Sequence, residues 1–194
     1  MDTQATVVLD RDDMRRTLQR IAHEIVEKNP EGMLALVGIH RRGAYLAKRL
    51  HALTGELLDS PVPLGTVDIA FYRDDLGRAG GHPYPVVHST ELDFAVDGRT
   101  IVIVDDVLYT GRTVRAAIDV IFDFGRPARV QLATLVDRGH RELPIRPDYV
   151  GKNIPTSTDQ RVNVRVDEVD GVDEVTIGVG GAGGPESPAR RAAA

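Results

Sequence analysis

Residues 101–113, IVIVDDVLYTGRT, hold in one run the features that decide the fold of this chain. Ile101 to Val104 are β-branched without polar alternation, which predicts a strand covered on both faces, as in a parallel sheet. Asp105 and Asp106 follow at the end of that strand, where open α/β sheets bind their ligands. The residues after Thr113 have a helical pattern. The run therefore predicts a buried parallel strand, an acidic strand end, a short loop and a helix.

The loop between the strand and the helix has the size and composition of a phosphate site. Free N–H groups at a helix N-terminus favour an anion, and Gly111 allows a close backbone approach. Thr110 and Thr113 add hydroxyl donors, and Thr113 could also cap the helix. Carboxylates that bind a diol, next to amides that bind a phosphate, suit a ribose 5-phosphate. A strand, an acidic turn and a capped helix without any ligand is the alternative, which the intact run disfavours.

The rest of the chain repeats the alternation of strands and helices. Helices are expected at 12–28, 43–53 and 113–124, and strands at 33–39, 62–72, 101–104 and 130–136. This order predicts a doubly wound α/β core with right-handed crossovers. After Pro147 the pattern changes to short alternating strands, at 162–166 and 175–177.

Composition narrows the class of protein. The 194 residues are 42% hydrophobic, enough for the core of one domain, and contain no cysteine, which excludes disulfides and thiolate metal sites. We find no apolar run of membrane-spanning length and no signal-peptide pattern at the N-terminus, and we expect a cytoplasmic protein without a membrane partner. The formal net charge of −5 argues against a general nucleic-acid binder but leaves room for a local basic face.

The run at 101–113 resembles the phosphoribosyl-diphosphate (PRPP) loop of type I phosphoribosyltransferases. Further segments resemble PyrR, a family of bacterial regulators of pyrimidine-operon attenuation that are also uracil phosphoribosyltransferases. These segments are LVGIHRRG at 36–43, YRDDL at 72–76, VDRGHRELPI at 136–145 and GKNIPTS at 151–157. The resemblance runs from about Val7 to Ile177, and the segments at 136–145 and 151–157 are the ones that single out PyrR.

The resemblance implies an α/β fold of the type I phosphoribosyltransferases, a mainly parallel sheet flanked by helices with a small hood. We expect one domain over residues 1–177. Its core would cover about 12–136, and its hood would come mainly from 137–177 together with the N-terminal strand. The Gly-rich segment 178–194 is expected to be a disordered tail.

The resemblance also assigns the expected site. Asp105 and Asp106 would face the ribose hydroxyls, and the loop after them would hold the 5-phosphate. The residues expected to bind PRPP or UMP are Arg41, Arg42, Asp105, Asp106, Val107, Leu108, Tyr109, Thr110, Gly111, Arg112 and Thr113. The catalytic candidates are Asp105, Asp106 and Arg73, and the base-binding candidates are Asp137, Arg138 and Val162. Plain packing in the hood is an equal alternative for Val162. Mg²⁺ would enter with PRPP, bound mainly by PRPP oxygens and water, and no protein ligand is assigned.

Two loops would complete that site. Residues 39–43, IHRRG, match the pyrophosphate loop, which in type I enzymes often contains a non-proline cis peptide. The family more often has Lys-Thr-Arg-Gly here, so His40 and Arg41 keep the positive charge but lose a hydroxyl. The loop from Tyr72 to about Thr90 would close over the site to exclude water, and Arg73 would then reach pyrophosphate. An insertion without a role is the alternative for this loop.

A basic surface gives the second expected function. In the PyrR family such a surface binds a stem-loop of the pyrimidine leader mRNA, and the matching residues are Arg20, His23, Arg141, Arg146 and Lys152. Solvated charges without a ligand are the alternative for any one of them. The sequence therefore predicts a uracil phosphoribosyltransferase that also binds leader mRNA in response to uridine nucleotide, in a homodimer or higher homo-oligomer. A weakly catalytic or non-catalytic UMP and PRPP sensor, and a phosphoribosyltransferase for another base, stay open.

Overall fold

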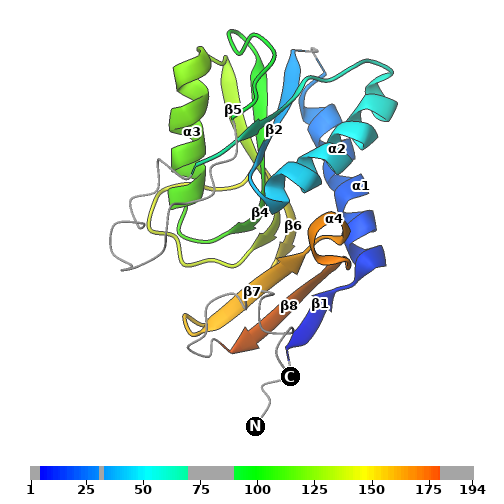
Figure 1. The fold of residues 1–194 in the computed structure, drawn as a ribbon, viewed down its shortest axis with the longest axis vertical. Helices are drawn as coiled ribbons and strands as arrows, with labels where there is room; N and C mark the ends of the chain where they lie inside the picture. The colour runs from blue at the N-terminus through cyan, green and yellow to red at the C-terminus, as the bar shows by residue number, and fades with distance from the viewer. Residues whose placement is uncertain (1–4, 31–32, 70–89, 180–194) are drawn as a thin grey trace, which may run out of the picture.

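A computed structural model describes residues 5–30, 33–69 and 90–179, which form a large parallel sheet and a small antiparallel one (Figure 1). The large sheet has five strands in the order β3-β2-β4-β5-β6, and every neighbouring pair is parallel. Their bounds are β2 (Leu34–Ile39), β3 (Leu64–Val67), β4 (Thr100–Leu108), β5 (Arg129–Asp137) and β6 (Tyr149–Asn153). The expected parallel α/β core is confirmed.

Three helices cover the two faces of this sheet. Helices α1 (Arg11–Lys28) and α2 (Arg42–Leu58) pack on one face, and α3 (Arg112–Phe124) packs on the other (Figure 1). The apolar face expected for α1 is buried, with Met14, Leu18, Ile21 and Ile25 all inside. Asp10 caps α1 by accepting a hydrogen bond of 2.8 Å from the Asp13 N–H group, as short polar side chains do at helix N-termini.

The small sheet is a hood that faces the carboxyl ends of the parallel strands. It pairs β1 (Thr6–Leu9), β8 (Glu174–Val179) and β7 (Gln160–Arg165) in that order, all antiparallel, with the short helix α4 (Asp167–Asp170) between β7 and β8. In Figure 1 the hood lies below the sheet, on the side where β4 ends and α2 begins. Ligands of parallel sheets bind at this edge, so the space between core and hood is where a site is expected.

The structure differs from the expected boundaries at two places. Residues 149–153, which were expected to belong to the hood, form β6 and extend the core sheet by pairing with β5. The buried Tyr149 side chain ties this edge strand by hydrogen bonds to Asn29, the C-cap residue of α1, and to Gln131 on β5. These long-range contacts have no sequence pattern. In addition, β8 continues to Val179, two residues beyond the expected end of the domain.

Some expectations lie outside the part of the chain that the structure describes. They are the loop from Tyr72 up to residue 89, including Arg73, and the tail from residue 180 onward. Within the described ranges, none of the helices combines the length and the apolar character needed to cross a membrane.

Candidate active site

Asp105 and Asp106 lie near the carboxyl end of β4, at the centre of the parallel sheet. Asp105 is buried and Asp106 is half-buried. The Asp105 carboxylate accepts a hydrogen bond of 2.9 Å from the Asp106 N–H group, and the Asp106 carboxylate accepts one of 2.9 Å from the Val107 N–H group. Burial raises the pKa of the Asp106 carboxyl, although hydrogen bonds and the charge of Arg42 oppose the rise. Such carboxylates are suited to accept hydrogen bonds from hydroxyl groups of a ligand.

The loop after β4 leads directly into the N-terminus of α3. Gly111 is the N-cap residue and has a φ of 92°, in the left-handed region that favours glycine. Thr113 lies inside the helix, so the cap expected from its hydroxyl is replaced by the Gly111 turn. Gly111 has no side chain to cap this helix end, and the Thr110 hydroxyl accepts a long hydrogen bond of 3.4 Å from the Arg112 N–H group. Helix N-termini of this kind, with backbone N–H groups at the end of a glycine-containing loop, accept a phosphate.

A second loop, after β5, holds residues 109–113, the loop after β4 that resembles a PRPP loop, in place. The N–H groups of Glu142 and Leu143 donate to the Thr110 carbonyl at 3.0 and 3.1 Å. The Glu142 carboxylate also forms an ion pair with Arg112 at 2.6 Å. The two loops therefore form one unit, and the partly exposed Arg112 side chain is paired with Glu142.

Arg141 lies at the centre of this unit. Its guanidinium forms an ion pair with Asp137 and donates to the carbonyls of Tyr109 at 2.7 Å and Ile145 at 3.0 Å. The side chain is only 21% exposed. Arg141, which was expected to contact RNA, thus directs its guanidinium into the protein and binds the loop after β4.

Arg138, one of the expected base-binding residues, is 8% exposed and joins the core to the hood. Its guanidinium donates to the Thr156 hydroxyl at 3.1 Å and to the Gln160 carbonyl at 2.9 Å, and it lies over the Tyr109 ring at 4.2 Å. His140 contacts the Thr156 carbonyl at 2.6 Å. Arg138 therefore connects Tyr109, in the loop after β4, to Thr156 and Gln160, where the chain enters β7.

Val162, the third expected base-binding residue, lies on β7 and packs against the apolar core on the α1 and α2 side of the sheet. It is half-buried. Its position fits the packing role that the sequence left open, and it stays only a weaker candidate for closing the base pocket.

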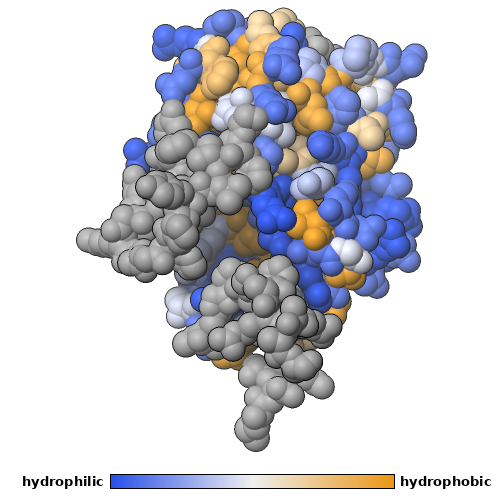
Figure 2. Space-filling view, viewed as in Figure 1, coloured by the Kyte–Doolittle hydropathy of each residue, from blue (hydrophilic) through white to orange (hydrophobic). Residues whose placement is uncertain are grey.

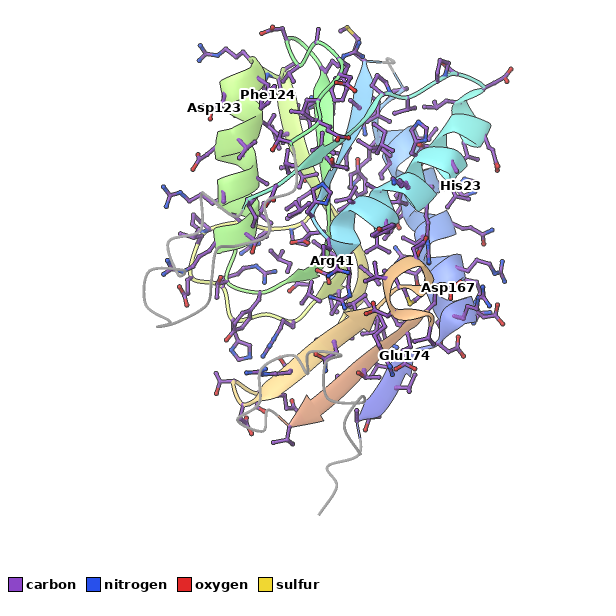
Figure 3. The ribbon with its side chains drawn as sticks, viewed as in Figure 1. His23, Arg41, Asp123, Phe124, Asp167 and Glu174 are labelled. Atoms are coloured by element: carbon purple, nitrogen blue, oxygen red, sulfur yellow. The ribbon has the colours of Figure 1, made fainter. Side chains whose placement is uncertain are left out.

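The loop between β2 and α2 lies beside the acidic pair. The peptide bond between His40 and Arg41 is cis, as the resemblance implied. A Cβ atom at Gly43 would lie 2.6 Å from the Val104 carbonyl oxygen and 3.2 Å from Cα of Asp105. Only glycine lets this loop approach β4 so closely, and the contact places Arg42 where its charge acts on the Asp106 carboxyl. Figure 3 shows Arg41 at the lower end of α2, above the hood.

The other four residues expected to bind RNA have different surroundings. His23 and Arg146 are exposed, and Figure 3 shows His23 on the outer side of α1. Arg20 donates to the carbonyls of Val150 and Gly151 at 2.9 and 2.7 Å, and Lys152 donates to the Val8 carbonyl at 2.9 Å. Arg20 and Lys152 therefore also connect α1, β6 and β1. Figure 2 shows mainly hydrophilic side chains on the part of this face formed by α1.

No metal site is formed by the described residues alone, which contain no group of three or more His, Cys, Asp or Glu side chains placed to hold an ion. Asp105 and Asp106 offer hard oxygen donors at the strand end. Such donors suit Mg²⁺ when a ligand and water complete its coordination.

Comparison with known proteins identifies the family. The phosphoribosyl transferase domain family matches residues 5–169. A protein named bifunctional protein PyrR from Roseiflexus sp. (strain RS-1) is 61% identical over 172 residues, which cover 88% of this chain and 93% of that protein. The protein of the same name from Pelotomaculum thermopropionicum is 57% identical over 171 residues, with the same coverage. The chain belongs to the PyrR family of phosphoribosyltransferases.

Solved structures support the fold of this PyrR chain. A hypoxanthine phosphoribosyltransferase from Trypanosoma cruzi, a mutant in a ternary substrates complex, has a TM-score of 0.70 at 19% identity and covers 91% of this chain and 95% of that one. The enzyme from Staphylococcus aureus has a TM-score of 0.66 at 18% identity, covering 90% and 92%. At this identity the likeness shows the type I phosphoribosyltransferase fold alone, which confirms the predicted fold class.

The sequence did not reveal several residues that shape this PyrR site. Glu142, Thr156 and Asp170 each bind an arginine expected to act on a ligand: Arg112, Arg138 and Arg42 respectively. Arg42 and Arg49 lie two helical turns apart on α2, and this spacing by itself indicates no partner. Their acidic partners lie 119 to 128 residues later in the chain, so no local pattern could connect them.

Proposed function

We propose that this chain is a uracil phosphoribosyltransferase, which makes UMP and pyrophosphate from uracil and PRPP, and that it also binds pyrimidine leader mRNA. The observation that carries the enzymatic part is the meeting of three elements at one sheet edge. They are the acidic end of β4, the N-terminus of α3 with its glycine N-cap, and the loop with the cis peptide bond before α2. The identity to proteins named bifunctional protein PyrR supports the choice of this reaction.

The proposed reaction breaks the bond between the ribose anomeric carbon and pyrophosphate, which leaves with the bonding electron pair. The N1 atom of uracil forms the new bond, and its proton passes to solvent. Asp105 and Asp106 would hold the ribose hydroxyls, and residues 109–113 would hold the 5-phosphate through backbone N–H groups. The loop with Arg41 and Arg42 would stabilise the departing pyrophosphate. No covalent intermediate with the protein is required, so catalysis would come from positioning and electrostatic stabilisation.

Mg²⁺ would accompany PRPP and neutralise part of the charge on the leaving pyrophosphate. Pyrophosphate oxygens and water would supply most of its ligands, with the Asp105 and Asp106 carboxylates nearby. We assign neither carboxylate as a direct ligand. Arg73 is proposed to contribute from the loop that lies outside the described residues.

The base pocket is proposed to lie between Asp137, Arg138 and the hood strand that carries Val162. The buried Arg138 side chain already binds Thr156 and Gln160, so uracil would be recognised largely by the backbone groups that this network holds in place. Assays with uracil, hypoxanthine, guanine and orotate test the base. Release of pyrophosphate with a base other than uracil would favour the alternative phosphoribosyltransferase.

The RNA part rests on the basic residues Arg20, His23, Arg146 and Lys152, with Arg141 connecting that face to the phosphate loop. RNA stem-loops are bound through phosphates and unstacked bases, which basic side chains without aromatic platforms can serve. Binding of a pyrimidine leader stem-loop should increase with UMP and fall steeply with salt. RNA binding without UMP synthesis would favour a nucleotide sensor. A homodimer or higher homo-oligomer and a cytoplasmic location are part of the same proposal.

A further inference from the structure

Two arginines of α2 fasten the hood to the core. Arg42 donates to Asp170 through Nε at 3.0 Å and through Nη2 at 2.8 Å. Two helical turns later, Arg49 donates to Glu168 at 2.9 and 2.6 Å and to Asp173 at 3.0 and 2.7 Å. All three carboxylates belong to α4 or the turn after it, so one side of α2 is fastened to this part of the hood.

The Arg42 pair differs from the Arg49 pairs in what lies next to it. Arg42 begins α2, one residue after the cis peptide bond, and its charge acts on the Asp106 carboxyl. Asp170 also accepts a hydrogen bond of 3.0 Å from the Val166 N–H group, which fixes the carboxylate within the hood. The Asp170 side chain is 17% exposed and the Arg42 side chain 36% exposed, so the carboxylate is better shielded from water than the guanidinium. The pair therefore connects the hood to the pyrophosphate loop itself.

The neighbouring Arg41 is in a different situation. It is exposed, and within the described residues no ion pair or side-chain hydrogen bond is found for it. Figure 3 shows Arg41 near the space between α2 and the hood. Arg42 is thus held by two parallel hydrogen bonds, whereas Arg41 is available to a ligand.

We propose that Arg42 is a positioning residue, which holds the pyrophosphate loop in its binding geometry through Asp170, and that Arg41 is the side chain that binds the pyrophosphate group of PRPP. This division deepens the proposed function and rests on it. A carboxylate that binds both Nε and Nη2 fixes the plane of a guanidinium, which the point charge of a lysine cannot reproduce. A loop held in place before binding loses less conformational entropy when the anion arrives.

The test compares Asp170→Asn with Glu168→Gln, a matched control. Both changes neutralise one hood carboxylate bound to an arginine of α2, but Glu168 is paired with Arg49, away from the loop. We expect Asp170→Asn to raise the KM for PRPP and the Kd for magnesium pyrophosphate by about tenfold, with a smaller effect on kcat. Glu168→Gln should change both constants by less than about twofold. The melting temperature should fall by a similar amount in the two variants.

Conservative variants separate positioning from a loss of stability. Asp170→Glu keeps a carboxylate and should recover most of the PRPP affinity, whereas Arg42→Lys keeps only the charge and should not. Equal KM and Kd values in Asp170→Asn and the wild-type protein would overturn the inference, as would an equal loss in Glu168→Gln. Calorimetry with magnesium pyrophosphate needs no base and no turnover. Failure of UMP synthesis would therefore refute the proposed function alone, and the pyrophosphate affinities would still decide the role of Arg42.

Discussion

The guanidinium of Arg141 donates to the backbone carbonyl of Tyr109 at 2.7 Å and forms an ion pair with Asp137. One side chain thereby joins the loop after β4, which is proposed to hold the 5-phosphate, to the loop after β5, which is proposed to hold the base. A residue expected from the sequence to contact RNA is therefore placed to control the nucleotide site as well. Under the proposed function, Arg141 would connect the nucleotide site directly to the RNA-binding surface.

Arg141→Gln should impair nucleotide binding as well as RNA binding. Removing the guanidinium leaves the Tyr109 and Ile145 carbonyls without their donor and frees the phosphate loop. We expect a rise of about tenfold in the KM for PRPP, corresponding to about 1.4 kcal/mol. Steady-state kinetics check this. Unchanged kinetics together with weakened RNA binding would make Arg141 a surface contact only.

Arg146→Gln should weaken RNA binding without changing the enzyme. Arg146 is exposed, and within the described residues no ion pair is found for it. Loss of one phosphate contact should reduce the slope of log affinity against log salt by about one. The control is Arg126→Gln, which removes the same charge from an exposed position after α3. Similar losses of RNA affinity in both variants would mean that total charge, not this surface, determines binding.

Gly43→Ala should damage both folding and activity. The added Cβ atom would lie 2.6 Å from the Val104 carbonyl oxygen, so either α2 or β4 must move. We expect a loss of about 1–3 kcal/mol in the free energy of unfolding, together with reduced UMP synthesis. Gly55→Ala on the same helix is the control, because the nearest atom would be 4.0 Å away. That change should stabilise the helix by about 0.5–1 kcal/mol. Equal stability of the two variants would refute the close approach.

Asp106→Asn should nearly abolish transfer, by about a hundredfold or more, yet stabilise the fold at neutral pH. Burial raises the pKa of this carboxyl in the folded protein. Above the ordinary aspartate pKa the unfolded chain therefore ionises more readily than the folded one, and wild-type stability is lost as pH rises toward the folded value. The asparagine variant avoids this loss. Denaturant unfolding at several pH values should show a stability gain that disappears in acid, and wild-type activity in the variant would mean that the site is misplaced.

The pattern along the chain was sufficient for the core of the fold and for the centre of the site. The apolar run into Asp105 and Asp106 predicted the central strand, its acidic end and the loop after it, because these depend on neighbours in sequence. The strand at 149–153 was missed, since YVGKN has no apolar run and is held mainly by pairing with β5 and by the Tyr149 contacts.

The partners of the site arginines could not be predicted for the same reason. From the sequence, Arg42 and Arg141 were both expected to be solvent-exposed cations that bind a ligand. The first is bound by Asp170, 128 residues away, and the second by carbonyls of two loops. Long-range pairing of this kind depends on how the hood docks on the core, and that geometry leaves no periodic signal in the sequence.

Formation of UMP from uracil and PRPP, measured with Mg²⁺ and then with excess EDTA, is the most direct test. Metal-dependent UMP that is lost in Asp106→Asn is the predicted result, and it would establish both the reaction and its place at the end of β4. Absence of UMP from a folded wild-type protein that still binds PRPP would refute the enzymatic function and leave a nucleotide-sensing RNA-binding protein or an enzyme for another base.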